Sequence, residues 1–267
     1  MTWAIAIGVG VLVGLSLGAL GAGGSILTVP ALVYLLGQEP TQATTGSLII
    51  VGLSAMFSAI AQYRDGKVLL GQGLMFSAVG VLGSWLGVRL ATGVDQTVLL
   101  VAFAGLMLVV ATTMTVRQVR ACKDCPEPPR PSPIVSLKPF SVDWLRLALL
   151  LVAATGVGLL TGFFGVGGGF VIVPALTLVL GFRMKEAVAT SLVVIAANSS
   201  IALGLRVGHG ITLEWSVVLL FAAAAIIGGL FGARLTRRIK PSHLTTGFIV
   251  MLVLIAGYTL ATSLPQR

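Results

Sequence analysis

The sequence carries very little charge for its length. Of 267 residues, only 9% are Asp, Glu, Lys or Arg, whereas 57% are hydrophobic. Soluble globular chains carry about 25% charged residues, and here apolar runs recur from end to end. These features exclude an ordinary soluble domain and a soluble domain with one membrane anchor. The unbroken runs also differ from the short alternating segments of a β-barrel. The predicted fold class is an all-α polytopic membrane protein.

Acidic side chains are missing from the middle of every apolar segment. Besides Asp124 and Glu127 of the central polar stretch, the acidic residues lie at segment ends or in loops: Glu39, Asp65, Asp95, Asp143, Glu186 and Glu214. Intramembrane proton relays and cation sites normally use carboxylates, so cation transport and carboxylate-driven proton antiport are disfavoured. An anion leaving a cell with a negative interior needs neither, because the field supplies about 2.3 kcal/mol per charge per 100 mV.

Cysteine and histidine are almost absent. Cys122 and Cys125 form one CxxC pair without further Cys or His nearby, so they cannot by themselves close a tetrahedral zinc site. Reduced thiols in a linker are the preferred interpretation, and a zinc ion shared across a dimer is the alternative. The chain also lacks HExxH, paired intramembrane aspartates and a buried Ser–His couple. No enzymatic activity, cofactor or metal is therefore predicted.

What the sequence does contain is an internal duplication. The stretch GALGAGGSILTVP at 18–30 recurs as GFFGVGGGFVIVP at 162–174, and thirteen of the thirty-one positions in 18–48 are identical to their counterparts. After one extra residue, GSWLGVRL at 83–90 matches GGLFGARL at 228–235. The predicted organisation is a first transmembrane repeat at 1–117, a Pro-rich linker at 118–143 and a second repeat at 144–267. The linker is expected to be irregular.

Each half contains the same five segments. An apolar arm leads through the glycine turn to a short second arm, and three longer segments follow. The expected ranges are 3–20, 25–37, 42–62, 68–91 and 97–117, then 144–161, 169–181, 187–205, 211–234 and 244–264. The longer segments meet the requirement of about 20 residues for a span, but the second arms do not. The first arm lacks the basic n-region of a signal peptide and partly recurs, so it is expected to be structural.

The distribution of Lys and Arg decides how the two arms are arranged. If they cross the membrane as one broken span, the two sides hold ten and seven basic residues, which is no bias. If they turn back at the glycines, fourteen fall on one side and only Arg89, Arg206 and Arg267 on the other. The hairpin satisfies the positive-inside rule. It predicts two inverted repeats, a cytoplasmic linker and both termini outside. The net charge of +9 is therefore assigned to cytoplasmic loops, and no nucleic-acid partner is expected.

The glycine turns are the candidate binding site. Short glycine-interrupted segments at matching positions of inverted repeats indicate a transporter site near the midplane. A helix that begins after such a turn directs unpaired N–H groups and its positive dipole end at the tip, so two tips would bind an anion. Two alternatives stay open. The glycines could only permit close helix packing, and Pro30 and Pro174 could begin helices after extended backbone.

Hydroxyl and amide side chains follow each turn, in ATTGSL at 43–48 and AVATSL at 187–192. They could line the site or bond back to their own helices. For Arg89 and Arg234, near segment ends, snorkelling is the ordinary explanation. The predicted substrate-binding residues are Gly21, Gly23, Gly24, Ser25, Thr45, Ser47, Gly165, Gly167, Gly168, Gly169, Thr190, Ser191 and Asn198.

The duplicated turns, the following (A/T)(G/T)SL and the GxRL ends resemble the TauE/SafE family of sulfite exporters. The resemblance covers nearly the whole chain except the linker. It implies a carrier of the bacterial inner membrane that exports sulfite, an organosulfonate or a related small sulfur-containing anion. Import of sulfate or another inorganic anion and a scaffold role are the alternatives. The expected partners are the small anion and the lipid bilayer, with the protein a monomer or homodimer.

Overall fold

The protein is almost entirely helical in the computed structural model, which describes residues 2–21, 23–66, 68–91, 94, 96–120, 135–137, 140–142, 144–164, 169–206 and 214–263. The first half contains α1 Thr2–Leu20, α2 Gly23–Pro30, the π-helical turn η1 Ala31–Leu35, α3 Pro40–Tyr63, α4 Leu70–Ala91 and α5 Gln96–Arg120. The second half contains α6 Trp144–Phe164, α7 Gly169–Leu178, α8 Met184–Arg206, α9 Trp215–Arg238 and α10 Pro241–Ser263. The expected segments correspond to these helices within a few residues.

Most of these helices are suited to a bilayer. Among the described residues, 7 helices (α3 to α6 and α8 to α10) are long and apolar enough to cross a membrane. Their outer faces expose large apolar side chains such as Leu82 at 71% and Val152 at 72%. Water would penalise such exposure, whereas lipid does not. The chain is a multi-pass membrane protein, and the all-α prediction is confirmed.

Both short arms are helical, so the alternative of extended backbone before Pro30 and Pro174 is wrong. Pro30 ends α2 and Pro174 lies inside α7. Proline lacks an N–H and therefore removes one backbone hydrogen bond of a helix. In the first half the helix after Pro30 widens into the π-helical turn η1. In the second half α7 continues through Pro174 to Leu178.

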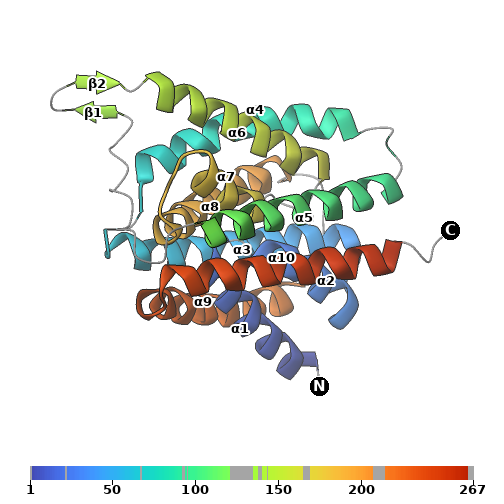
Figure 1. Cartoon of the computed structure of the whole chain (residues 1–267). Coiled ribbons are helices and arrows are strands. Elements are labelled where there is room, and N and C mark those ends of the chain that lie inside the picture. The colour runs from blue at the N-terminus through green and yellow to red at the C-terminus, as the bar shows by residue number, and fades with distance from the viewer. Residues whose placement is uncertain are drawn as a thin grey trace.

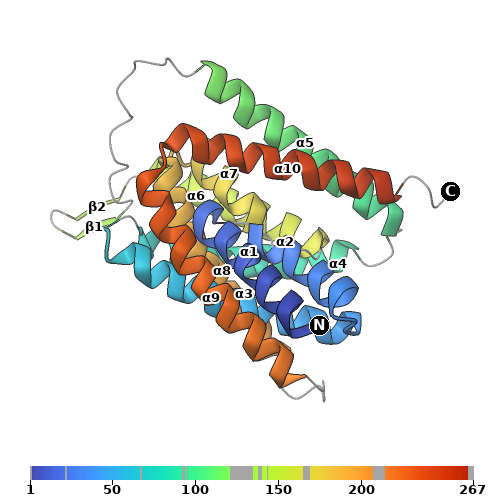
Figure 2. The same cartoon turned by 90° about the horizontal axis from the view of Figure 1, so that it is seen from below.

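The first helix of each half packs against a helix of the other half. α1 packs on α9, and α6, the counterpart of α1, packs on α4, the counterpart of α9. α3 and α8 lie against each other at the centre, and 56% of each candidate span is buried. α5 and α10 form a pair at one side of the molecule (Figures 1 and 2). Each half therefore depends on the other for its core.

Glycines line both of these helix–helix interfaces, the α1–α9 seam and the α6–α4 seam. A β-carbon on Gly14 or Gly18 of α1 would overlap backbone carbonyl oxygens of α9, and one on Gly228 or Gly232 would overlap those of α1. The second seam, between α6 and α4, repeats the pattern with Gly158, Gly162, Gly83 and Gly87. Small residues allow such close approach of membrane helices. At Gly18 and Gly162, the first glycines of the two duplicated motifs, the packing interpretation is therefore confirmed.

Contacts also fix the directions of the helices. Leu69, just before α4, meets Thr190 of α8, and Ser77 meets Asn198, eight residues later in both segments. α4 and α8 therefore run in the same direction. By contrast, Gln118 near the end of α5 bonds to Ser242 near the start of α10. The equivalent helices α5 and α10 therefore run in opposite directions.

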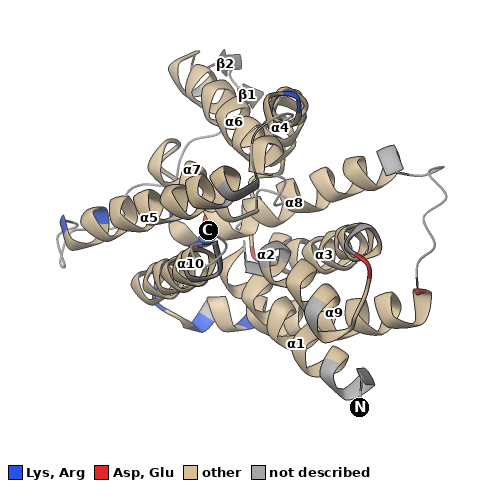
Figure 3. Cartoon of the chain, turned by 90° about the vertical axis from the view of Figure 1, so that its right-hand side faces the viewer, with Lys and Arg blue, Asp and Glu red and all other residues tan. Residues whose placement is uncertain are grey.

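Two short strands lie in the segment between the halves. β1 Val135–Leu137 pairs antiparallel with β2 Phe140–Val142, so the expectation of an irregular linker is wrong for these residues. Branched and aromatic side chains favour strands, and they outweigh the nearby prolines. Charged residues of the described chain lie at helix ends and in loops (Figure 3). The helix bodies carry neither sign, as the sequence predicts.

Candidate functional site

The first glycine turn reverses the chain inside the protein. α1 ends at Leu20, and Gly21 has φ of +73°, a conformation that side chains rarely adopt. Its N–H donates to the carbonyl oxygen of Leu17 at 2.8 Å. A β-carbon on Gly21 would also lie 2.5 Å from the Ser191 hydroxyl oxygen. Glycine is therefore required here for both its backbone conformation and its size.

Three helices supply donors to the last turn of α1. A helix terminus leaves its final carbonyl groups without intrahelical partners, and side chains of α3, α8 and α9 satisfy them here. Gln62 Nε2 donates to Gly18 O at 3.3 Å, Thr236 Oγ1 to Ala19 O at 3.3 Å and Ser191 Oγ to Gly21 O at 3.0 Å. These bonds fix the turn and partly neutralise the negative end of the α1 dipole.

The short helices α2 and α7 begin directly after the two glycine turns and contact each other. Gly23 is the first residue of α2, and the buried Gly24 packs against Leu17. Gly169, the first residue of α7, is also buried. Gly24 of α2 and the first turn of α7 therefore lie within the protein.

The hydroxyl residues after the two turns are buried. Thr45 and Ser47 of α3 are 4% and 7% exposed, and Thr190 and Ser191 of α8 are fully buried. Ser47 donates to the carbonyl oxygen of Thr44 in its own helix, at 2.8 Å. Ser191 also bonds back to its own helix, to Val188 O at 2.8 Å, in addition to Gly21. Ser191 thus joins its helix to the described glycine turn.

Thr190 and Asn198 both contact α4. Thr190 Oγ1 accepts a hydrogen bond from the Leu69 N–H at 3.3 Å, and Asn198 Oδ1 accepts one from Ser77 Oγ at 2.5 Å. The structure therefore brings Gly21 and Ser191 together, whereas Asn198 lies two turns further along α8. Of the remaining predicted residues, Gly165, Gly167, Gly168 and the side chain of Ser25 lie outside the described part of the chain.

Gly46 and Thr190 occupy equivalent positions of the two halves but differ in size. Their neighbours on the facing helices compensate for this difference in size. Thr190 Cγ2 would lie 3.2 Å from a β-carbon on Gly73. At the equivalent place in the first half, Val218 Cγ2 would lie 3.3 Å from a β-carbon on Gly46. The large and small partners have exchanged helices, so the two packing contacts stay similar. Only the second half, however, presents a hydroxyl there.

Buried glutamines are the features that the sequence analysis missed. Gln72 of α4 is 7% exposed, and neither its amide nitrogen nor its amide oxygen has a protein partner. Gln62, fully buried on α3, has a free Oε1 in addition to its bond to Gly18. Buried amides normally form hydrogen bonds, so these exceptions mark polar interior surface. The sequence signal that could have identified them is a glutamine within an apolar segment, as at Gln72, or at its end, as at Gln62.

Arg89 lies outside this interior. Its guanidinium sits 4.0 Å from the ring centroid of Trp85, and both side chains are exposed on α4. Arg234 is exposed as well. An arginine stacked on an interfacial tryptophan gains a cation–π contact, and the long stem reaches toward the membrane surface. Snorkelling, the ordinary explanation, accounts for Arg89. Cys122 and Cys125 lie outside the described residues.

A multi-pass helical fold with an internal glycine turn and buried polar side chains is the arrangement expected of a membrane transporter. The sequence profile of the family described as "Sulfite exporter TauE/SafE" matches residues 6–259. The chain therefore belongs to the TauE/SafE family. The family resemblance noted from the duplicated motifs is confirmed.

Curated relatives have the same general description. The chain is 32% identical over 253 residues to the "Probable membrane transporter protein" of Xylella fastidiosa strain Temecula1, covering 94% of this chain and 92% of that protein. It is 26% identical over 270 residues to the "Probable membrane transporter protein YunE" of Bacillus subtilis, covering 96% of both. No solved structure matches significantly.

Proposed function

We propose that the protein is a secondary transporter that exports a small sulfur-containing anion, such as sulfite or an organosulfonate, across the bacterial inner membrane. The observation that carries this proposal is that α2 and α7 contact each other and that Gly24 and Gly169, at their starts, are buried. Backbone N–H groups at helix starts bind anions without a fixed positive charge. The hydrogen bonds to the end of α1 also favour an anion at this place. They partly neutralise the negative carbonyl end of α1, which lies beside the start of α2.

Alternating access would come from two inverted repeats around this site. Equivalent helices α5 and α10 run in opposite directions, and each half packs its first arm on the other half. Such an arrangement lets one repeat move relative to the other around a fixed central site. In this proposal the linker is cytoplasmic and both termini are outside, as the distribution of Lys and Arg favours.

Efflux from proteoliposomes tests the proposal. We expect purified protein to release loaded sulfite or sulfoacetate faster with an inside-negative potential, and Gly23→Val to abolish this flux. Gly8→Val is the matched control, because a β-carbon on Gly8 of α1 has nothing within 4 Å. Retained folding of both variants would be checked by thermal unfolding. Normal flux through Gly23→Val, or equal loss in both variants, would contradict the proposed site.

Import of sulfate or another small inorganic anion is the second candidate, because backbone amides at a helix start distinguish anions mainly by charge and size. The same vesicles separate the two functions. Export of sulfite predicts competition by sulfonates and weak transport of sulfate. An importer would instead accumulate sulfate against its gradient when a coupling ion gradient is imposed.

A further inference from the structure

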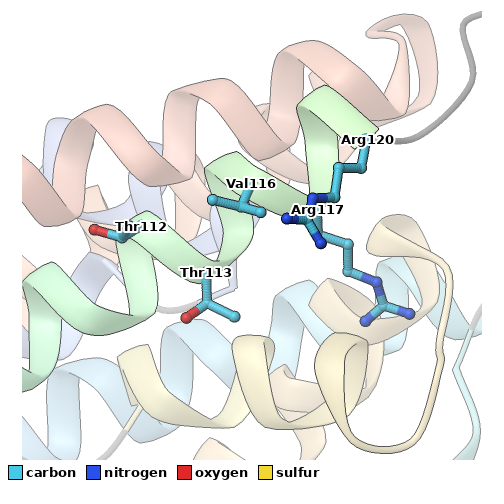
Figure 4. Close-up of a pocket in the computed structure, with 5 residues that line it drawn as sticks. All are labelled: Thr112, Thr113, Val116, Arg117 and Arg120. Atoms are coloured by element: carbon cyan, nitrogen blue, oxygen red, sulfur yellow. The ribbon is translucent and has the colours of Figure 1, made fainter.

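A cavity of about 390 Å³ opens on the surface of α5, away from the glycine turns. Its lining consists of Thr112, Thr113, Val116, Arg117 and Arg120, all from the last turns of that helix (Figure 4). These residues are exposed on a helix that packs mainly against α10. The cavity is therefore a groove in the outer surface of a membrane protein, and the transport site does not use it.

The groove is amphipathic along its length. Thr112 and Thr113 donate their hydroxyl hydrogens to Leu108 O and Val109 O of their own helix, each at 2.7 Å. Their methyl groups and Val116, 42% exposed, leave that part of the groove without a free donor. The two arginines supply the polar end. An apolar channel that ends in two guanidinium groups is complementary to an amphiphile with an anionic head.

The arginines are partly preorganised. Arg117 Nη1 donates to Thr177 O near the end of α7 at 2.8 Å, and this bond orients the guanidinium. A guanidinium has five N–H donors in a planar fork that matches a phosphate, so donors remain for a ligand. Arg120 follows three residues later on α5, and residues at that spacing lie on the same face of a helix. Both groups can therefore reach one phosphate.

The position of the groove along the membrane normal suits a lipid headgroup. The end of α5 lies at the same end of the molecule as the start of α6 (Figure 1), where Trp144 is 76% exposed. Exposed tryptophans concentrate at membrane–water interfaces. Val119, between the two arginines in sequence, is 79% exposed. The guanidinium groups thus lie where lipid phosphates are found, beside surface that favours acyl chains.

We propose that this groove binds an anionic phospholipid, with the phosphate held by Arg117 and Arg120 and an acyl chain along Val116 and the threonine methyl groups. Basic pockets between transmembrane helices recognise anionic headgroups in this way. Because Arg117 also bonds to α7, the bound lipid would hold α5 beside the short helix of the second half. The proposal needs only that the protein lies in a membrane, so it is independent of the transported anion.

Lipid titration of the detergent-solubilised protein tests this proposal. We expect phosphatidylglycerol to raise the unfolding temperature, and phosphatidylcholine and inorganic phosphate to have much smaller effects. Removing one arginine should weaken phosphatidylglycerol binding about fivefold. Arg120→Gln is the primary variant, because it leaves the bond between Arg117 and Thr177 intact. The double variant Arg117→Gln, Arg120→Gln should weaken binding further.

Arg89→Gln is the matched control. Like Arg120→Gln, it removes an exposed arginine near the end of a membrane helix. Because Arg89 does not line the groove, this variant should leave phosphatidylglycerol binding unchanged. Native mass spectrometry would count retained lipids in each variant. Equal lipid binding by the wild type and the double variant would overturn the proposal. An equal effect of inorganic phosphate would also overturn it, because the groove would then bind free anions.

Discussion

The Ser191 hydroxyl of α8 donates a hydrogen bond to the Gly21 carbonyl oxygen at 3.0 Å, across the boundary between the two halves of the chain. Gly21 forms the first glycine turn, and Ser191 follows the second turn at a position equivalent to Ser47. The polar residue of one repeat therefore stabilises the turn of the other. This bond connects the helix that follows the second motif to the turn of the first motif.

Ser191→Ala is expected to reduce anion flux more than tenfold if the turn must be held for the α2 amides to point at the substrate. It should also lower the free energy of unfolding by about 1 kcal/mol, since a buried carbonyl loses its donor. Proteoliposome efflux and thermal unfolding measure the two effects. Ser200→Ala is the control, because Ser200 is exposed and bonds only within its own helix in the described structure. Unchanged flux in Ser191→Ala would show that the bond is dispensable.

Gly18→Ala should destabilise the protein, because the new β-carbon would overlap the carbonyl oxygen of Gly229 and separate α1 from α9. Overpacking of this kind costs roughly 1–3 kcal/mol. Gly8→Ala on the same helix provides the comparison, as a β-carbon there has nothing within 4 Å. Thermal unfolding in detergent should separate the two variants. Similar unfolding temperatures would mean that the seam can relax.

Gly73→Ala and Thr190→Ala should interact energetically. A β-carbon on Gly73 would lie 3.2 Å from Thr190 Cγ2 and 3.5 Å from Val193, so the first substitution alone crowds the contact between α4 and α8. Removing the threonine methyl relieves part of the crowding. We therefore expect the double variant to be more stable than the sum of the single effects, by about 0.5–2 kcal/mol. Strict additivity in a double-mutant cycle would contradict the contact.

Gln72→Leu should stabilise the protein but reduce transport. Both amide atoms of Gln72 are buried without a protein partner, and replacing such a group by an apolar one of similar size removes a desolvation penalty. If the amide serves the anion pathway, flux falls as the unfolding temperature rises. Ser58→Ala supplies the comparison, because its buried hydroxyl oxygen is also unpartnered but lies next to Gly229. The flux of Ser58→Ala should stay normal. Equal changes in flux for the two variants would show that Gln72 does not contribute to the anion pathway.

The sequence by itself determined the helical membrane class, the ranges of the helices and the position of the two glycine turns. Hydrophobicity over twenty residues and an internal duplication are local or periodic signals, so they need no knowledge of which helices touch. Hydropathy did not identify the β1–β2 ribbon, because its three-residue strands lie among prolines and charged residues.

Only the tertiary structure decided the role of each glycine and hydroxyl. Gly18 and Gly21 belong to one motif, yet the first packs against α9 and the second provides a positive φ beside Ser191. Ser47 and Ser191 look equivalent, but in the described structure only Ser191 donates across the halves. These differences depend on contacts between residues more than a hundred positions apart, such as Thr190 opposite Gly73. A local pattern specifies which residues are small or polar, whereas packing selects what each of them faces.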